Sequence, residues 1–147
     1  MNGLTYTKMR EGCTLTAQLD RGGNYAIGWG HNSPMITADT VWTQEQADNQ
    51  VACIDYPNAQ AWAASDVGAA WSSLDTVRQA ALVDMAYELG KNGLSQFHNM
   101  LSAVRQGLWE SAHDACLASD YAEQVPGRAA GAAYMLLTGE WPSGFGA

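Results

Sequence analysis

The spacing of apolar and polar positions changes near residue 43. Between residues 14 and 36, small and β-branched side chains alternate with polar ones. A period of two is typical of a strand. Gly22-Gly23-Asn24 is a turn signal, and Tyr25-Ala26-Ile27 follows it as a second run of strand type. We therefore expect a small antiparallel hairpin with Asp20 near its turn.

Helical signals lie on both sides of this hairpin. Residues 3 to 11 form a pattern typical of a short helix that ends at Gly12. Thr43-Gln44-Glu45-Gln46 has the form of a capping box, because a threonine hydroxyl can accept from the amide three residues on and a glutamine there can reach back. Pro57 either interrupts the helix that follows or begins a new one.

The longest helix is expected in the middle of the chain. Ser72-Ser73-Leu74-Asp75 is a capping segment, and helical spacing continues from it to Gly90. One stripe of this helix is apolar: Leu74, Val77, Ala81, Met85 and Leu89. Further apolar residues lie beside the stripe, so we expect this helix to be central and buried on most sides. Shorter helices are predicted at about 95–106, 109–118 and 126–138.

These elements predict an α+β fold in one domain covering residues 1–147. A hairpin lobe would span approximately residues 12–42, and an all-helical lobe would comprise residues 1–11 together with 43–147.

Composition narrows the functions that remain. The formal charge is -8 and the sequence pI is about 4.5, so phosphate backbones should repel the chain and nucleic acid is not an expected partner. Cys13, Cys53 and Cys116 are scattered, which favours reduced thiols over a disulfide framework or a zinc site. The N-terminal residues lack a basic region followed by an apolar run, so we expect neither a signal peptide nor a membrane anchor.

Two carboxylates stand out for their chemistry. Glu11 and Asp20 are separated by eight residues across the expected junction of helix and hairpin. On spacing alone, such a pair is more often two solvated side chains. Glycosidic bonds, however, are broken by pairs of this kind, with one group as acid and the other as base, nucleophile or charge stabiliser.

The surrounding sequence resembles the T-even phage lysozymes, the endolysins of glycoside hydrolase family 24. The resemblance begins with Glu11, Asp20 and Tyr25-Ala26-Ile27-Gly28-Trp29-Gly30-His31. It continues through Met85-Ala86-Tyr87-Glu88-Leu89-Gly90 and Val125-Pro126-Gly127-Arg128-Ala129, and covers nearly the whole chain in the same order.

The resemblance implies a lysozyme-like cleft between two lobes that binds the glycan strand of bacterial peptidoglycan. Hydrolysis would fall on the β-1,4 bond between N-acetylmuramic acid and N-acetylglucosamine, without a cofactor or metal. Glu11 matches the general acid, whose pKa must be raised by partial desolvation. Asp20 matches the second carboxylate, and Arg128 matches the arginine that approaches the acid from the helical lobe.

Other positions are expected to support the site. Tyr121 and Gln124 lie where family members line the cleft, although Tyr121 is equally well placed for the core. Glu88 stands where the T-even enzyme has a glutamine, so a substrate-binding amide would here be a carboxylate. The alternative is that Glu88 and Asp84, one turn earlier, are both solvated. His31 is expected to be a structural, hydrogen-bonded residue, with Asp55 as one candidate partner.

Ala26 departs from the family pattern. The family usually has a threonine at this position, and its hydroxyl helps to place the attacking water. A lytic transglycosylase needs no positioned water, because the sugar's own hydroxyl attacks, so that activity is one alternative. A catalytically weakened lysozyme fold that only binds glycan, or serves as a structural piece of a phage particle, is another.

The resemblance also suggests a biological setting. The protein would be a monomer that stays in the cytoplasm of the host bacterium until release to the periplasm and cell wall. Without an export signal, its delivery would depend on a holin-type membrane lesion.

Overall fold

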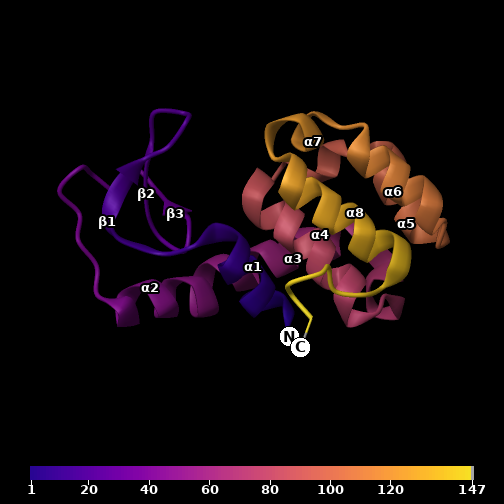
Figure 1. Cartoon of the computed structure of the whole chain (residues 1–147), viewed down its shortest axis with the longest axis horizontal. Coiled ribbons are helices and arrows are strands. Elements are labelled where there is room, and N and C mark those ends of the chain that lie inside the picture. The colour runs from indigo at the N-terminus through magenta and orange to yellow at the C-terminus, as the bar shows by residue number, and fades with distance from the viewer. Residues whose placement is uncertain (147) are drawn as a thin grey trace.

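The computed structural model describes residues 1–146 and has an α+β fold, as the sequence predicted. A three-stranded antiparallel sheet lies at one end of the molecule and helices make up the remainder (Figure 1). Helix α1 lies between the sheet and the other helices, and α2 lies beside the sheet.

Helix α1, Gly3–Glu11, has the predicted bounds. The Asn2 side chain caps it by accepting a hydrogen bond from the Thr5 amide. Gly12 ends it with φ at 69°, a conformation that favours glycine. Because Tyr6 and Thr7 are buried against the helical core, the helix is anchored and holds Glu11 at its last position.

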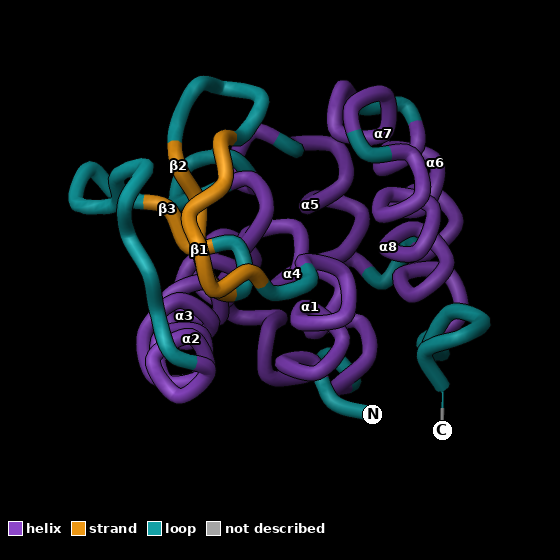
Figure 2. The backbone as a smooth tube through the Cα atoms, turned by 60° about the vertical axis from the view of Figure 1, so that its left-hand side comes forward, coloured by secondary structure: helices purple, strands orange, loops and turns teal. Residues whose placement is uncertain are grey.

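The predicted hairpin is present, and a third strand extends it. Strand β1, Thr14–Leu19, pairs with β2, Tyr25–Gly28, and β2 pairs with β3, His31–Asn32, a strand that the sequence did not predict (Figure 2). Strand β3 is only two residues long, so no run of alternating residues could indicate it. Its partners in the register are Ala26 for Asn32 and Ile27 for His31.

One continuous helical path covers residues 44–67. Helix α2, Gln44–Gln50, begins with the predicted capping box of Thr43 and Gln46. A π-helix, Val51–Asp55, leads into α3, Tyr56–Val67, whose second residue is Pro57. The proline therefore begins a new helical segment without breaking the path, because the wider π turn precedes the residue that cannot donate a backbone hydrogen bond.

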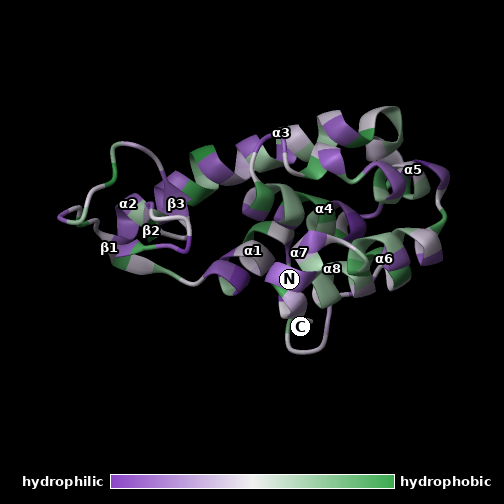
Figure 3. Cartoon of the chain, turned by 90° about the horizontal axis from the view of Figure 1, so that it is seen from above, coloured by the Kyte–Doolittle hydropathy of each residue, from purple (hydrophilic) through white to green (hydrophobic). Residues whose placement is uncertain are grey.

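Helix α4, Thr76–Leu89, is the central helix of the core. A 3-10 segment, Gly68–Ser73, precedes it, and Asp75 caps it by accepting from the Arg78 amide. Its residues 80–86 are all buried, as expected for a helix covered on most sides. Contacts with α1, α3 and α8 cover it, and Figure 3 shows α4 between α3 and α8.

The C-terminal helices follow the prediction with two corrections. The helix expected from about residue 95 is a 3-10 segment, Leu94–Gln96, followed by α5, His98–Gln106, because Phe97 has non-helical torsions. Helix α7, Asp120–Gln124, was not predicted, since five residues show no apolar periodicity. Helices α6, Trp109–Leu117, and α8, Pro126–Thr138, lie where they were expected.

Within residues 1–146, no helix combines the length and apolar character needed to cross a membrane.

The buried face of α4 should dominate the stability of the protein. Leu82 is fully buried in the core, whereas Leu117 of α6 is 44% exposed. We expect Leu82→Ala to lower the free energy of unfolding by about 2–5 kcal/mol through lost burial and a cavity. The matched control Leu117→Ala should change it by less than about 0.5 kcal/mol. Urea denaturation measures both, and equal losses would contradict the assignment of α4 as the core helix.

Candidate active site

A buried arginine joins the helical part of the molecule to the end of α1. Arg128, near the start of α8, donates from Nη1 to Glu11 Oε1 at 2.7 Å and to Glu88 Oε2 at 3.0 Å. Its guanidinium also forms a bidentate pair with Asp84, through Nη2 at 2.8 Å and Nε at 2.9 Å. The predicted approach of Arg128 to Glu11 is therefore present, in a larger group of charges than the sequence indicated.

Asp84 is the residue that the sequence interpretation missed. It was taken to be solvated, but it is fully buried, and Thr7 Oγ1 donates to its Oδ1 at 2.7 Å. A buried carboxylate needs such partners, because an unpaired charge in the interior is very costly. The burial of Asp84 could have been inferred from its position among the apolar residues of α4, because residues 80–86 are all buried.

Burial, together with the neighbouring carboxylates, favours a proton on Glu11. Burial raises the pKa of the Glu11 carboxyl, the nearby guanidinium of Arg128 opposes that rise, and the charges of Glu88 and Asp84 add to it. Burial works against the charge of Arg128, but hydrogen bonds and the charge of Asp84 raise its pKa, so that the guanidinium stays ionised. One cation therefore faces three carboxylates.

Close backbone packing fixes the place of the Glu11 carboxyl group. Gly30 has φ at 83°, and a Cβ at this position would collide with the Glu11 carboxylate. Glycine is therefore required both for the turn between β2 and β3 and for the space that Glu11 occupies. The Tyr87 hydroxyl donates to the Trp29 carbonyl, which ties α4 to the same turn.

Asp20 lies directly after β1, where the hairpin turn orients it. Its Oδ1 accepts hydrogen bonds from the amides of Gly22 and Asn24, both at 2.9 Å. A pocket of about 490 Å³ brings it together with the acid from α1 and residues of the sheet and α4. The lining is Glu11, Asp20, Ala26, Gly30, Asn32, Tyr87, Glu88, Leu89 and Gly90. We call this the Glu11 pocket.

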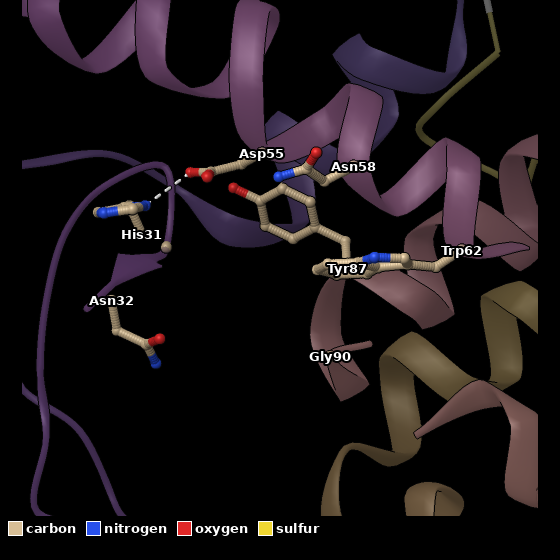
Figure 4. A pocket seen from close by; sticks show the side chains of 8 residues that line it. His31, Asn32, Asp55, Asn58, Trp62, Tyr87 and Gly90 are labelled. Carbon is tan, nitrogen blue, oxygen red and sulfur yellow. Dashed lines mark hydrogen bonds and ion pairs between the residues drawn. The ribbon is translucent and has the colours of Figure 1, made fainter. Parts of the chain in front are cut away.

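A smaller pocket of about 170 Å³ adjoins the Glu11 pocket, with Gly30, Asn32, Tyr87 and Gly90 in both linings. Figure 4 shows His31 there, pointing toward Asp55. His31 Nδ1 lies 2.9 Å from Asp55 Oδ2, so the suggested partner is the one that the structure has. This pairing fits the structural role expected of His31.

Tyr121 and Gln124 line a different pocket, of about 430 Å³, which shares only Leu89 with the Glu11 pocket. Tyr121 is a core residue by burial, at 2% exposed, and its ring packs edge-on to Phe97. Its hydroxyl has no hydrogen-bond partner among residues 1–146. These two residues are therefore not brought into contact with the Glu11 pocket.

No group of three or more histidine, cysteine, aspartate or glutamate side chains that could hold a metal ion occurs in the described part of the chain. The arrangement supports chemistry by carboxyl groups: a half-buried acid with a raised pKa and a second carboxylate fixed by a turn, at the wall of one pocket.

Parts of this chain are similar to known phage proteins. It is 38% identical over 79 residues to the pre-baseplate central spike protein Gp5 of Enterobacteria phage T4, covering 54% of this chain and 14% of that protein. It is 50% identical over 52 residues to the endolysin of Lactococcus phage c2, covering 34% of this chain and 22% of the endolysin. The endolysin of Lactococcus phage phivML3 gives the same values. The chain thus spans less than a quarter of the length of these relatives.

A family model described as "Phage lysozyme" matches residues 8–131, a range that includes Glu11, Asp20, Ala26 and Arg128. Because this match covers most of the chain, the protein belongs to the phage lysozyme family.

Proposed function

We propose that the protein is a phage endolysin-like muramidase that hydrolyses the β-1,4 bond between N-acetylmuramic acid and N-acetylglucosamine in bacterial peptidoglycan. The observation that carries the proposal is the pair of Glu11 and Asp20 in one pocket, with Arg128 on the acid. Similarity to two phage endolysins supports the substrate class. The hairpin lobe and the helical lobe of a single lysozyme-like domain would form the walls of the glycan cleft.

Glu11 acts as the general acid in this proposal. Its raised pKa favours the protonated form, which can donate to the leaving oxygen of the glycosidic bond. Once Glu11 has given up this proton, its carboxylate is stabilised by Arg128, whose Nη1 lies 2.7 Å from Oε1. Glu11 can therefore release its proton, and the positive charge of Arg128 then balances the negative charge that remains on the carboxylate.

Asp20 acts as the second carboxylate. Its Oδ1 accepts hydrogen bonds from two backbone amides of the hairpin turn, which orient the carboxyl group at the wall of the Glu11 pocket. From the opposite side of the sugar it can stabilise the positive charge of an oxocarbenium-like transition state or take a proton from water.

Ala26 supports one alternative within the same fold. Its methyl group lines the Glu11 pocket and cannot hydrogen-bond to a water. This favours a lytic transglycosylase, which needs no positioned water. Mass spectrometry of digested peptidoglycan separates the two reactions, and we expect reducing ends from hydrolysis. Anhydro-muramyl ends as the main product would contradict hydrolysis and establish transglycosylation.

Similarity to a central spike protein supports a further alternative, a glycan-binding or structural piece of a phage particle. The intact group of Glu11, Asp20 and Arg128 favours an active enzyme.

As an endolysin, the protein would act as a monomer, remain in the host cytoplasm until a holin-type lesion forms, and reach the cell wall through that lesion.

The role of Glu11 is tested by Glu11→Gln, which removes the transferable proton and keeps the side-chain shape. We expect kcat on purified peptidoglycan to fall by about 100-fold or more, as for the loss of a general acid. Release of reducing sugar is the measurement, with Glu45→Gln on exposed α2 as the matched control. Undiminished activity of Glu11→Gln would refute the assignment.

The raised pKa of Glu11 predicts the alkaline side of the pH profile. An acid must carry its proton to donate it, so kcat/KM should fall as pH rises through the raised pKa, and this limb should be flat below it. Initial rates on peptidoglycan across the pH range measure the limb, with circular dichroism as the control for folding. A fall that begins at the ordinary value of 4.5 would contradict the effect of burial on Glu11.

A further inference from the structure

The register of the sheet places a polar side chain beside Ala26. Strands β2 and β3 pair Ala26 directly with Asn32. Residues opposite each other in an antiparallel pair point to the same face, with Cβ atoms roughly 4.5–5.5 Å apart. Both residues line the Glu11 pocket, so the Asn32 amide lies within reach of the space above the Ala26 methyl group.

Most other polar side chains of the Glu11 pocket already have partners. Arg128 binds Glu11 and Glu88, the Tyr87 hydroxyl donates to a carbonyl, and one oxygen of Asp20 accepts the turn amides. The exposed Asn32 amide forms no hydrogen bond within residues 1–146. Figure 4 shows its side chain pointing away from His31. Asn32 is therefore the uncharged hydrogen-bonding group still available at this wall.

A second amide flanks Ala26 but does not compete for this place. Gln18 of β1 pairs with Ala26 from the other side. Its Nε2 donates to Thr16 Oγ1 at 3.2 Å, and Gln18 is absent from the lining of the Glu11 pocket. The two neighbours of Ala26 thus differ in one respect that matters here: only Asn32 reaches the pocket.

We propose that Asn32 positions the attacking water, in the place that Ala26 leaves without a hydrogen-bonding group. This inference rests on the proposed hydrolysis. An asparagine amide suits the task, because its carbonyl accepts from a water hydrogen while its NH₂ can donate to a water lone pair. Held in this way above Ala26, water lies beside Asp20 at the sheet wall of the pocket.

The step balances with the groups in the pocket. Water oxygen bonds to the anomeric carbon as the bond from that carbon to the leaving oxygen breaks. The proton of Glu11 goes to the leaving oxygen, and the proton lost by the attacking water goes to Asp20. Exchange with solvent then returns a proton to Glu11 and removes the one on Asp20. Asn32 forms and breaks no covalent bond, so it acts on the rate of this step through water placement alone.

The inference is tested by Asn32→Ala in the full chain with peptidoglycan as the substrate. Loss of the water contact should lower kcat by roughly ten- to a hundredfold and leave KM unchanged, because the contact matters only in the transition state. Gln18→Ala is the matched control, since Gln18 flanks the same alanine outside the pocket, and it should retain wild-type kcat.

A rescue variant separates water placement from damage to the short strand. Ala26→Thr restores a hydroxyl on the same face, so adding it to Asn32→Ala should recover at least part of the lost kcat, whereas a misfolded β3 would not be repaired. In wild type, Ala26→Thr should add little, because Asn32 already fills the role. Such dependence of one substitution on the other is the expected coupling of neighbouring groups.

Other outcomes overturn the inference. A higher KM with unchanged kcat would make Asn32 a sugar-binding residue, and an equal loss in Gln18→Ala would assign the role elsewhere. If wild type cleaves peptidoglycan and Asn32→Ala cleaves it equally well, the water role is wrong and the proposed function stands. A wild-type protein that releases no reducing ends would overturn both.

Discussion

The buried charge of Arg128 is the constraint on which the site depends. A guanidinium this far from solvent requires anionic partners, and the helical core supplies one in Asp84, which is itself held by Thr7. With two of its nitrogens fixed by Asp84, Arg128 can turn only its remaining edge toward Glu11 and Glu88. The interaction therefore links α1, α4 and α8 and sets the direction in which the acid points.

The sheet contributes the other half of the site through backbone geometry. Gly30 leaves room for Glu11, the hairpin turn orients Asp20, and the register between β2 and β3 pairs Ala26 with Asn32. These positions depend on turns and on the pairing of strands, whereas the position of Arg128 and its carboxylate partners depends on packing in the helical core. A chemical site at this boundary combines an acid whose pKa is raised by burial in the helical side with a carboxylate, Asp20, that the hairpin turn orients.

Sequence reasoning predicted those parts of the structure that local chemistry determines. Gly12 and Gly90 mark the ends of α1 and α4, and the capping box at Thr43 marks the start of α2. Glu11, Asp20 and Arg128 were found through the family motif. The burial of Asp84 was missed because it depends on contacts with Thr7 and Arg128, which are distant in the sequence. The pairing of Asn32 with Ala26 was missed because a two-residue strand has no period to detect.

The π-helix shows how a local irregularity serves the site at a distance. Gln50 Nε2 donates a hydrogen bond of 3.0 Å to Asp55 Oδ1, five residues further along the chain. Side chains five residues apart lie on the same face of a π-helix, whereas in an α-helix they do not. A π turn contains one residue more than an α turn, which shifts the following residues by about 100° around the helix axis. Asp55 therefore faces His31, in the direction that Ile54 would take in an uninterrupted α-helix. An aliphatic side chain there would leave the His31 ring without its acceptor. Since His31 and Asn32 alternate between the two faces of β3, a fixed His31 also fixes the face on which Asn32 meets the pocket.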